Sequence, residues 1–152
     1  MESVGKIVVA IIAGIGGFVA MNLWGPFSGP AFDYPTATID QKQAYLERKA
    51  KNFSRGFRLT AGSKAEISKV HVEAEYDLVS ISVQLKDPNF RNVPSSEIEK
   101  FRKLILKTSC TLTERKLLTQ TAFKLRVRYF HTDGSRFMST EASRDNCASY
   151  LN

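Results

Sequence analysis

The cysteines and histidines, two of each, are the residues with the most distinctive chemistry in this 152-residue chain. Cys110 and Cys147 could form a disulfide, since the interval between them contains a predicted strand pair whose ends return towards its start. In an oxidising compartment such a bridge would fasten the last strand to the preceding helix. The alternative is a pair of unrelated buried thiols, as residence in the cytoplasm would require. An even cysteine count and the export expected below favour the disulfide.

The histidines do not combine with other residues into a recognisable catalytic motif. His71 lies on the polar side of an alternating segment, and His131 precedes a turn sixty residues later. The sequence holds no HExxH, GxSxG, phosphate-binding loop or GxGxxG pattern, and no carboxylate-rich spacing that suits a metal. His131, Asp133 and Ser135 share one turn, which is a poor arrangement for a catalytic triad. We therefore expect a protein that is not an enzyme and has no metal or cofactor.

Basic residues are the third group with a chemical role, because 22 Lys and Arg against 15 Asp and Glu give a net charge of +7. Lys124, Arg126 and Arg128 alternate along a predicted strand, so they point the same way at a spacing of about 7 Å. One interpretation is that Glu73 and Glu75 of an earlier strand pair neutralise them across the sheet. The other is an electropositive face for anionic lipid, an acidic subunit or nucleic acid.

A second basic segment is a predicted helix over residues 39–55, which begins at a capping box formed by Thr38 and Gln41 and ends near Gly56. Its few apolar positions favour a place on the surface, against headgroups or another subunit. Its candidates for interface or anion contact are Arg48, Lys49, Lys51 and Arg55. Nucleic acid is the least favoured partner, because no known binding module accompanies these basic residues.

The elements that must position these residues follow an apolar N-terminal segment, which has no charged residue from position 7 to position 32. As a helix, residues 7–24 would span roughly 27 Å, close to the hydrocarbon core of a bilayer. Trp24 falls where an interfacial aromatic belongs. A cleaved signal peptide is the alternative, but Phe18-Val19-Ala20 has a bulky residue where a small one is needed. We expect residues 1–24 to be an uncleaved membrane anchor.

The anchor also indicates an orientation and a way of packing. Lys6 precedes it and Asp33 is the first charge after it, and positive residues favour the cytoplasmic side. We expect a single-pass protein of the inner membrane with a cytoplasmic N-terminus and a periplasmic C-terminal domain. Small residues four apart could let a partner's helix approach closely, although such residues are common in membrane helices. They are Ala10, Ala13, Gly14, Gly16, Gly17 and Ala20.

The rest of the chain predicts a Pro/Gly-rich linker over residues 25–37 and one soluble domain over residues 38–152. Period-two alternation predicts a strand pair over residues 70–85, and a second pair is joined at Asp133-Gly134. The order of elements is helix, hairpin, helix, helix, hairpin. We therefore expect an α+β fold in which an antiparallel sheet of two hairpins is backed by helices on one face.

A resemblance emerges from the C-terminal half, through residues that occur there in a fixed order. They are Cys110, Arg115, Leu117-Leu118, Leu125, Val127, Tyr129, Asp133-Gly134 and Cys147. The pattern resembles small, mostly uncharacterised bacterial periplasmic proteins with a Cys near a helix end, a short helix, two strands joined at a Gly turn and a closing Cys. The resemblance covers residues 59–147. It implies an exported α+β domain with a disulfide, and it implies no particular activity.

These features together favour a non-catalytic accessory subunit of a larger integral membrane protein complex. The complex could be respiratory, photosynthetic, transport or secretion machinery, and the lipid bilayer itself is the other expected contact. The alternative function is a stand-alone periplasmic module that binds a ligand or polyanion, whose binding would weaken steeply with salt.

The expected topology is testable by thiol labelling of intact spheroplasts. The C-terminal domain should face outward, with both sulfurs blocked until a reductant is added. If the domain faces the cytosol and both sulfurs react freely, the anchor orientation, the disulfide and the docking role are all contradicted.

Overall fold

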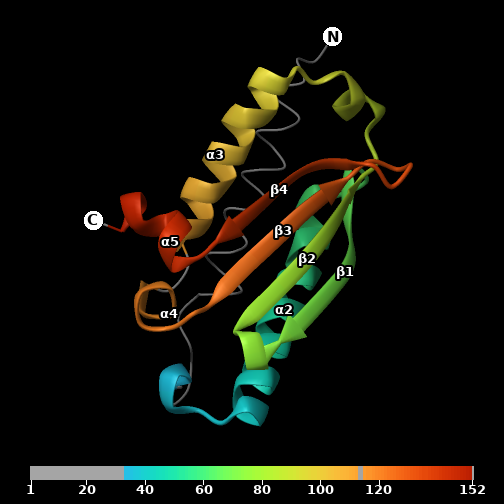
Figure 1. The fold of residues 1–152 in the computed structure, drawn as a ribbon. Helices are drawn as coiled ribbons and strands as arrows, with labels where there is room; N and C mark the ends of the chain where they lie inside the picture. The colour runs from blue at the N-terminus through green and yellow to red at the C-terminus, as the bar shows by residue number, and fades with distance from the viewer. Residues whose placement is uncertain (1–32, 113–114, 152) are drawn as a thin grey trace.

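A four-stranded sheet is the centre of the computed structural model, which describes residues 33–112 and 115–151 (Figure 1). The elements in chain order are η2 (Tyr34–Thr36), α2 (Ile39–Ala61), β1 (Ala65–Glu73), η3 (Ala74–Tyr76), β2 (Leu78–Leu85), η4 (Pro88–Asn92), α3 (Ser95–Leu112), α4 (Arg115–Gln120), β3 (Lys124–Phe130), β4 (Arg136–Ala142), α5 (Arg144–Cys147) and η5 (Ala148–Tyr150). The α+β class expected from the sequence is confirmed.

The expected membrane anchor, with its small residues and Trp24, lies outside the described residues, as does the linker up to residue 32. None of the helices within the described ranges has the length and hydropathy needed to cross a bilayer.

The sheet has the order β1-β2-β3-β4, and its two outer pairs are the predicted antiparallel hairpins. The central pair is parallel, with Leu78 beside Lys124 and Gln84 beside Phe130. The expectation of a wholly antiparallel sheet is therefore wrong at its centre. The physical reason is the long connection between β2 and β3, which contains α3 and α4. Through these helices the chain returns to the end of the sheet where β2 began, so β3 runs in the same direction as β2.

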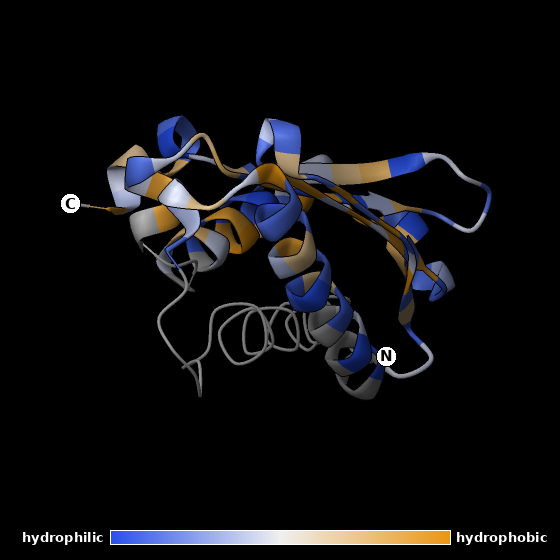
Figure 2. Cartoon of the chain, turned by 90° about the horizontal axis from the view of Figure 1, so that it is seen from below, coloured by the Kyte–Doolittle hydropathy of each residue, from blue (hydrophilic) through white to orange (hydrophobic). Residues whose placement is uncertain are grey.

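Alternation along the strands separates a packed face from an open face. Val79, Ile81 and Val83 of β2 are fully buried, and Leu125 and Val127 lie beside the first two of them on β3. These residues share one apolar core with residues of α2, α3 and α4. Figure 1 shows α2 behind the β1 side of the sheet and α3 alongside β4, and Figure 2 shows the sheet as one layer with the long helices to one side. The expected helical layer on one face is confirmed.

Helix α2 is longer than expected, because it continues through Gly56 and ends at Ala61. A glycine inside a helix costs only about 1 kcal/mol relative to alanine, so Gly56 does not stop it. Gly62 follows as the C-cap with φ +58°, and glycine adopts such a positive φ without steric cost. At the other end the capping box is confirmed, since the Gln41 N–H donates to Thr38 Oγ1 and the Thr38 N–H donates to Gln41 Oε1.

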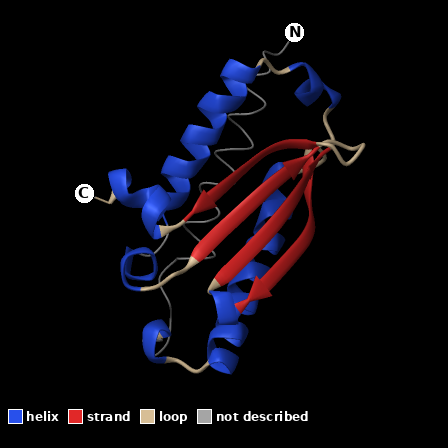
Figure 3. Ribbon diagram, in the orientation of Figure 1, coloured by secondary structure: helices blue, strands red, loops and turns tan. Residues whose placement is uncertain are grey.

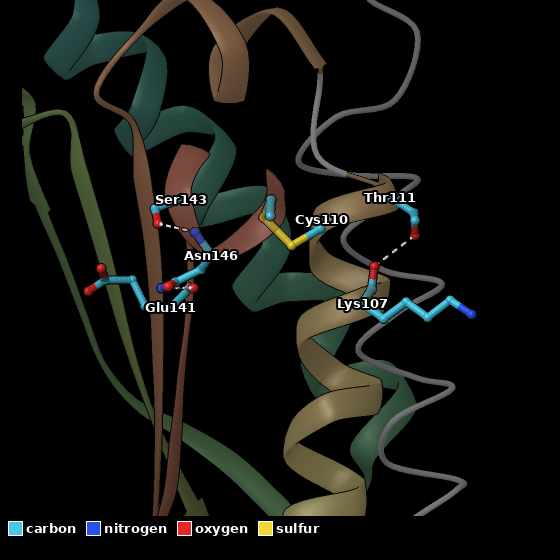
Figure 4. Close-up of a disulfide and its surroundings, with 7 residues drawn as sticks. Lys107, Cys110, Thr111, Glu141, Ser143 and Asn146 are labelled. Carbon is cyan, nitrogen blue, oxygen red and sulfur yellow. Dashed lines mark hydrogen bonds between the residues drawn. A yellow bond between two sulfur atoms is a disulfide. The ribbon is translucent and has the colours of Figure 1, made fainter. Parts of the chain in front are cut away.

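A disulfide joins Cys110, near the end of α3, to Cys147 at the end of α5, with their Cα atoms 5.4 Å apart (Figure 4). Both residues are buried. Ser143 caps α5 by accepting from the Asn146 N–H, and the Asn146 side chain donates to the Glu141 carbonyl of β4. The predicted bridge is confirmed, and it fastens the end of the second hairpin to the crossover helix.

Replacing both Cys110 and Cys147 with serine should lower the free energy of unfolding by about 3.8 kcal/mol, because a sequence separation of 37 no longer constrains the unfolded chain. Urea unfolding of the full chain in mild detergent measures the change. Dithiothreitol should lower the stability of the native chain and leave that of the double variant unchanged. Equal unfolding midpoints for the oxidised and reduced native chain would contradict the role assigned to the bridge.

Candidate functional site

The side of the sheet opposite the packed face, called here the open face, brings together polar and basic side chains from all four strands. Its members are Glu66, Lys69, His71, Glu73, Ser80, Ser82, Gln84, Lys124, Arg126, Arg128, Ser139 and Glu141. Two rows cross it from edge to edge. His71, Ser80, Arg126 and Glu141 form one, and the next has Lys69, Ser82, Arg128 and Ser139.

The predicted basic ladder lies on this face, but its neutralising partner comes from a different strand. Arg126 donates from Nε to Glu141 Oε2 at 3.0 Å, and its Nη2 lies 2.9 Å from the same oxygen. Glu73 instead approaches His71, with 2.6 Å between Oε1 and Nε2. The proposed pairing of the ladder with Glu73 and Glu75 is therefore not observed for Arg126. Because β3 lies between β2 and β4, Arg126 is two strands, roughly 10 Å, away from β1.

Three basic residues of the open face remain without an ion pair among the described residues: Lys69, Lys124 and Arg128. Arg128 lies between Ser82 and Ser139, which are neutral. The pair of Arg126 and Glu141 adds no net charge, and with His71 neutral Glu73 adds one negative charge, which the three unpaired cations outnumber. The open face is therefore electropositive over part of its area.

The residues considered for catalysis have structural partners instead. Asp133 Oδ1 accepts from the Ser135 N–H at 2.9 Å and from the Ser135 hydroxyl at 2.6 Å, and these bonds lower the pKa of the Asp133 carboxyl. The ring of His131 packs edge-on against Phe137 with centroids 5.4 Å apart. In the ranges that the structure describes, no group of three or more His, Cys, Asp or Glu residues could hold a metal ion.

The hydroxyl groups of two buried tyrosines, Tyr34 and Tyr129, have raised pKa values. Burial raises the pKa of Tyr129, whose hydroxyl has no hydrogen-bond partner in the part of the chain that the structure describes. Burial also raises the pKa of Tyr34, and its hydroxyl donates to Asp77 Oδ1 at 2.7 Å. Asp77 has φ +50° in the turn before β2, and its carbonyl accepts from the Lys124 N–H at 2.9 Å. Asp77 therefore joins η2 to the start of β3, where the basic ladder begins.

The basic residues of α2 do not all share one environment. Arg48, Lys51 and Arg55 are exposed, as expected for contact candidates. Lys49 is only 5 % exposed, and its Nζ lies 5.5 Å from the centre of the Tyr45 ring. This differs from the expected surface contact, because position 49 is one turn beyond Tyr45 on the packed side of the helix, where a lysine stem can be buried.

A groove between α2 and β1 is a further surface that the sequence analysis missed. One cavity of about 480 Å³ is lined by the end of α2, including Ser54 and Arg58, and by β1 from Ala65 to Val70. A second of about 460 Å³ continues it along Lys51 and Ser54 to Val72. Strand β1 stands at the edge of the sheet beside it (Figure 3). No sequence signal distinguishes an edge strand of this kind from one that is paired on both sides.

The fold and these surfaces define a disulfide-bridged α+β domain with an electropositive sheet face and a groove at one sheet edge. Comparisons with protein-family models, curated proteins and solved structures found no match to this chain.

The pair of Arg126 and Glu141 should couple measurably, because their side chains are only 32 % and 28 % exposed. In a double-mutant cycle with Arg126→Met and Glu141→Gln, we expect a coupling energy near 0.5 kcal/mol in unfolding experiments, reduced by salt. The pair of Lys100 and Glu97 is a matched control, since Lys100 is 73 % exposed and should couple less. A coupling no larger than that of the control would mean that the pair does not restrain Arg126.

Proposed function

We propose that this chain is a non-catalytic, membrane-anchored accessory subunit whose exported domain binds an acidic surface of a larger inner-membrane complex. The observation that carries the proposal is the electropositive open face, where Arg128 and Lys124 stand without ion pairs among the described residues. Electrostatic complementarity of this kind favours a partner that presents carboxylates.

The spacing of the basic groups supports a broad contact. Lys124 and Arg128 are four residues apart on β3, roughly 14 Å along the strand. Lys69 shares a row with Arg128 two strands away, roughly 10 Å across the sheet. Three cations at these distances reach separate carboxylates, and the hydroxyls of Ser82 and Ser139 beside Arg128 offer hydrogen bonds between them.

Two further features support the cellular setting of the proposal. A disulfide between Cys110 and Cys147 is typical of proteins in oxidising compartments such as the periplasm. Residues 7–24 have the length and hydropathy of a membrane-spanning helix. His71, His131 and Asp133, the residues best suited to acid–base chemistry, each contribute to local structure, which supports a binding role.

Exchanging Lys124 and Arg128 for glutamine should weaken the association of the full chain with its complex at least fivefold, because two unpaired cations are removed from the contact. The complex is isolated in mild detergent through a tag on this chain, over a range of salt concentrations. The matched control is Lys103→Gln with Lys107→Gln, which removes the same charge from the exposed surface of α3.

Loss of association in both double variants would indicate a general charge effect and contradict the proposed face. A native chain that purifies alone, and whose deletion leaves every membrane complex unchanged in size, would contradict the accessory role itself. Binding to vesicles of anionic lipid with the same dependence on Lys124 and Arg128, in place of protein binding, would replace the acidic subunit by the membrane surface.

A further inference from the structure

The outer edge of β1 carries backbone groups that point away from the sheet and into the groove along α2. His71 lies opposite Ser80 and Val72 opposite Val79 in the antiparallel pair with β2. In such a pair the backbone groups of successive residues point alternately towards the partner strand and away from it. The Val72 carbonyl points away, because it accepts a hydrogen bond from Gln43 of α2 at 3.0 Å.

The side chain of Gln43 imitates a neighbouring strand at one end of this edge. Its Nε2 donates to the Val72 carbonyl, and its Oε1 accepts from the Ala74 N–H at 2.9 Å. One residue of a parallel strand makes the same two bonds, to the carbonyl of one residue and the N–H of the residue two positions later. The edge of β1 can therefore form hydrogen bonds with a neighbouring strand. Gln43 takes up only the outward groups at the C-terminal end of this edge.

The next outward position along β1 is Val70, two residues before Val72 and on the same side of the backbone. Among the described residues, none is hydrogen-bonded to the outward N–H and carbonyl of Val70. An exposed strand edge of this kind is a template for pairing with another extended chain. The two cavities that meet at Ser54 and Val70 provide the space for it.

The size of the groove suits an added strand. Along α2 it extends from Glu47 to Gly62, which is roughly 22 Å of helix. An extended segment of roughly six or seven residues has the same length. Ile67, Val70 and Val72 are half-buried and pack against the core, so they offer apolar contacts to alternate side chains of the segment.

The charge of the groove determines which segment fits. Lys51 and Arg58 of α2 line it. Of its two acidic residues, Glu66 lies 2.8 Å from Lys86, and Glu47 keeps its charge because it accepts at 2.7 Å from the neutral Gln43 amide. The two basic groups of α2 outnumber this one carboxylate, which favours an anionic occupant.

We propose that the groove between α2 and β1 binds an extended acidic segment of a partner protein as a fifth strand of the sheet. The inference deepens the proposed accessory role and rests on it for the existence of a partner. It assigns a second contact, separate from the cations of the open face, in which backbone hydrogen bonds supply affinity and Lys51 and Arg58 select for acidic residues.

The test uses the full chain in mild detergent and a labelled ten-residue peptide that alternates valine or threonine with aspartate. Val70→Pro removes the outward N–H and leaves the bonds between β1 and β2 in place, because proline is tolerated at a strand edge. We expect it to weaken peptide binding at least tenfold by fluorescence anisotropy. Val70→Thr is the matched control, since it keeps the N–H and the β-branched shape, and it should bind within a factor of two of the native chain.

The peptide itself provides a test that does not depend on the stability of a variant. N-methylation of alternate amides in one register should abolish binding, and N-methylation in the other register should leave it intact, because only one side of an added strand bonds to β1. Hydrogen exchange at Val70 should slow when the unmodified peptide binds. Exchanging Lys51 and Arg58 for glutamine should weaken binding several-fold and reduce its dependence on salt.

The inference would be overturned if the native chain failed to bind the acidic peptide. It would also be overturned if both N-methylated series lost affinity equally, or if folded Val70→Pro bound the peptide with full affinity. A dimer of the native chain that Val70→Pro abolishes would assign the edge to a second copy and overturn it as well. Lys124→Gln with Arg128→Gln should leave peptide binding unchanged. If the chain binds the peptide but associates with no membrane complex, the accessory role is contradicted, while the groove still stands as a peptide-binding site.

Discussion

The parallel pairing of β2 with β3 is the constraint on which the rest of the domain depends. Parallel neighbours cannot be joined by a tight turn, so the chain must cross from the end of β2 to the start of β3 through an intervening layer. In this protein α3 and α4 make the crossing. Because β2 and β3 each also pair with a hairpin partner, they are the central strands, and β1 and β4 are left at the edges.

The disulfide acts on the same connection. Cys110 belongs to the crossover helix and Cys147 follows the second hairpin, so the bridge joins the two segments that flank β3 and β4. At that end the hairpin also packs on the helical layer, where Leu117, Leu118 and Phe123 are buried.

The open face and the α2–β1 groove follow from this topology in different ways. On the open face, Arg126 is held by Glu141 of the neighbouring β4, and the residues directly opposite Arg128 are Ser82 and Ser139. At the groove, α2 stands far enough from the sheet edge to leave cavities, although Gln43 bridges the gap at one end. Both surfaces carry exposed basic side chains.

The sequence by itself determined the local features: the capping box at Thr38, the two hairpins and the alternation that places Lys124, Arg126 and Arg128 on one side of a strand. It also predicted the pairing of Cys110 with Cys147, because the two flank a hairpin whose ends meet. Each of these depends on residues close in the chain or on a simple period, which a single sequence records directly.

Only the tertiary structure decided the order and direction of the strands, the partner of Arg126, the burial of Lys49 and the groove beside β1. These depend on contacts between segments distant in the chain. Hairpins with the same alternating pattern can lie side by side in a parallel or an antiparallel sense, and the choice is made by how the connecting helices pack over the sheet. Local periodicity carries no record of that choice.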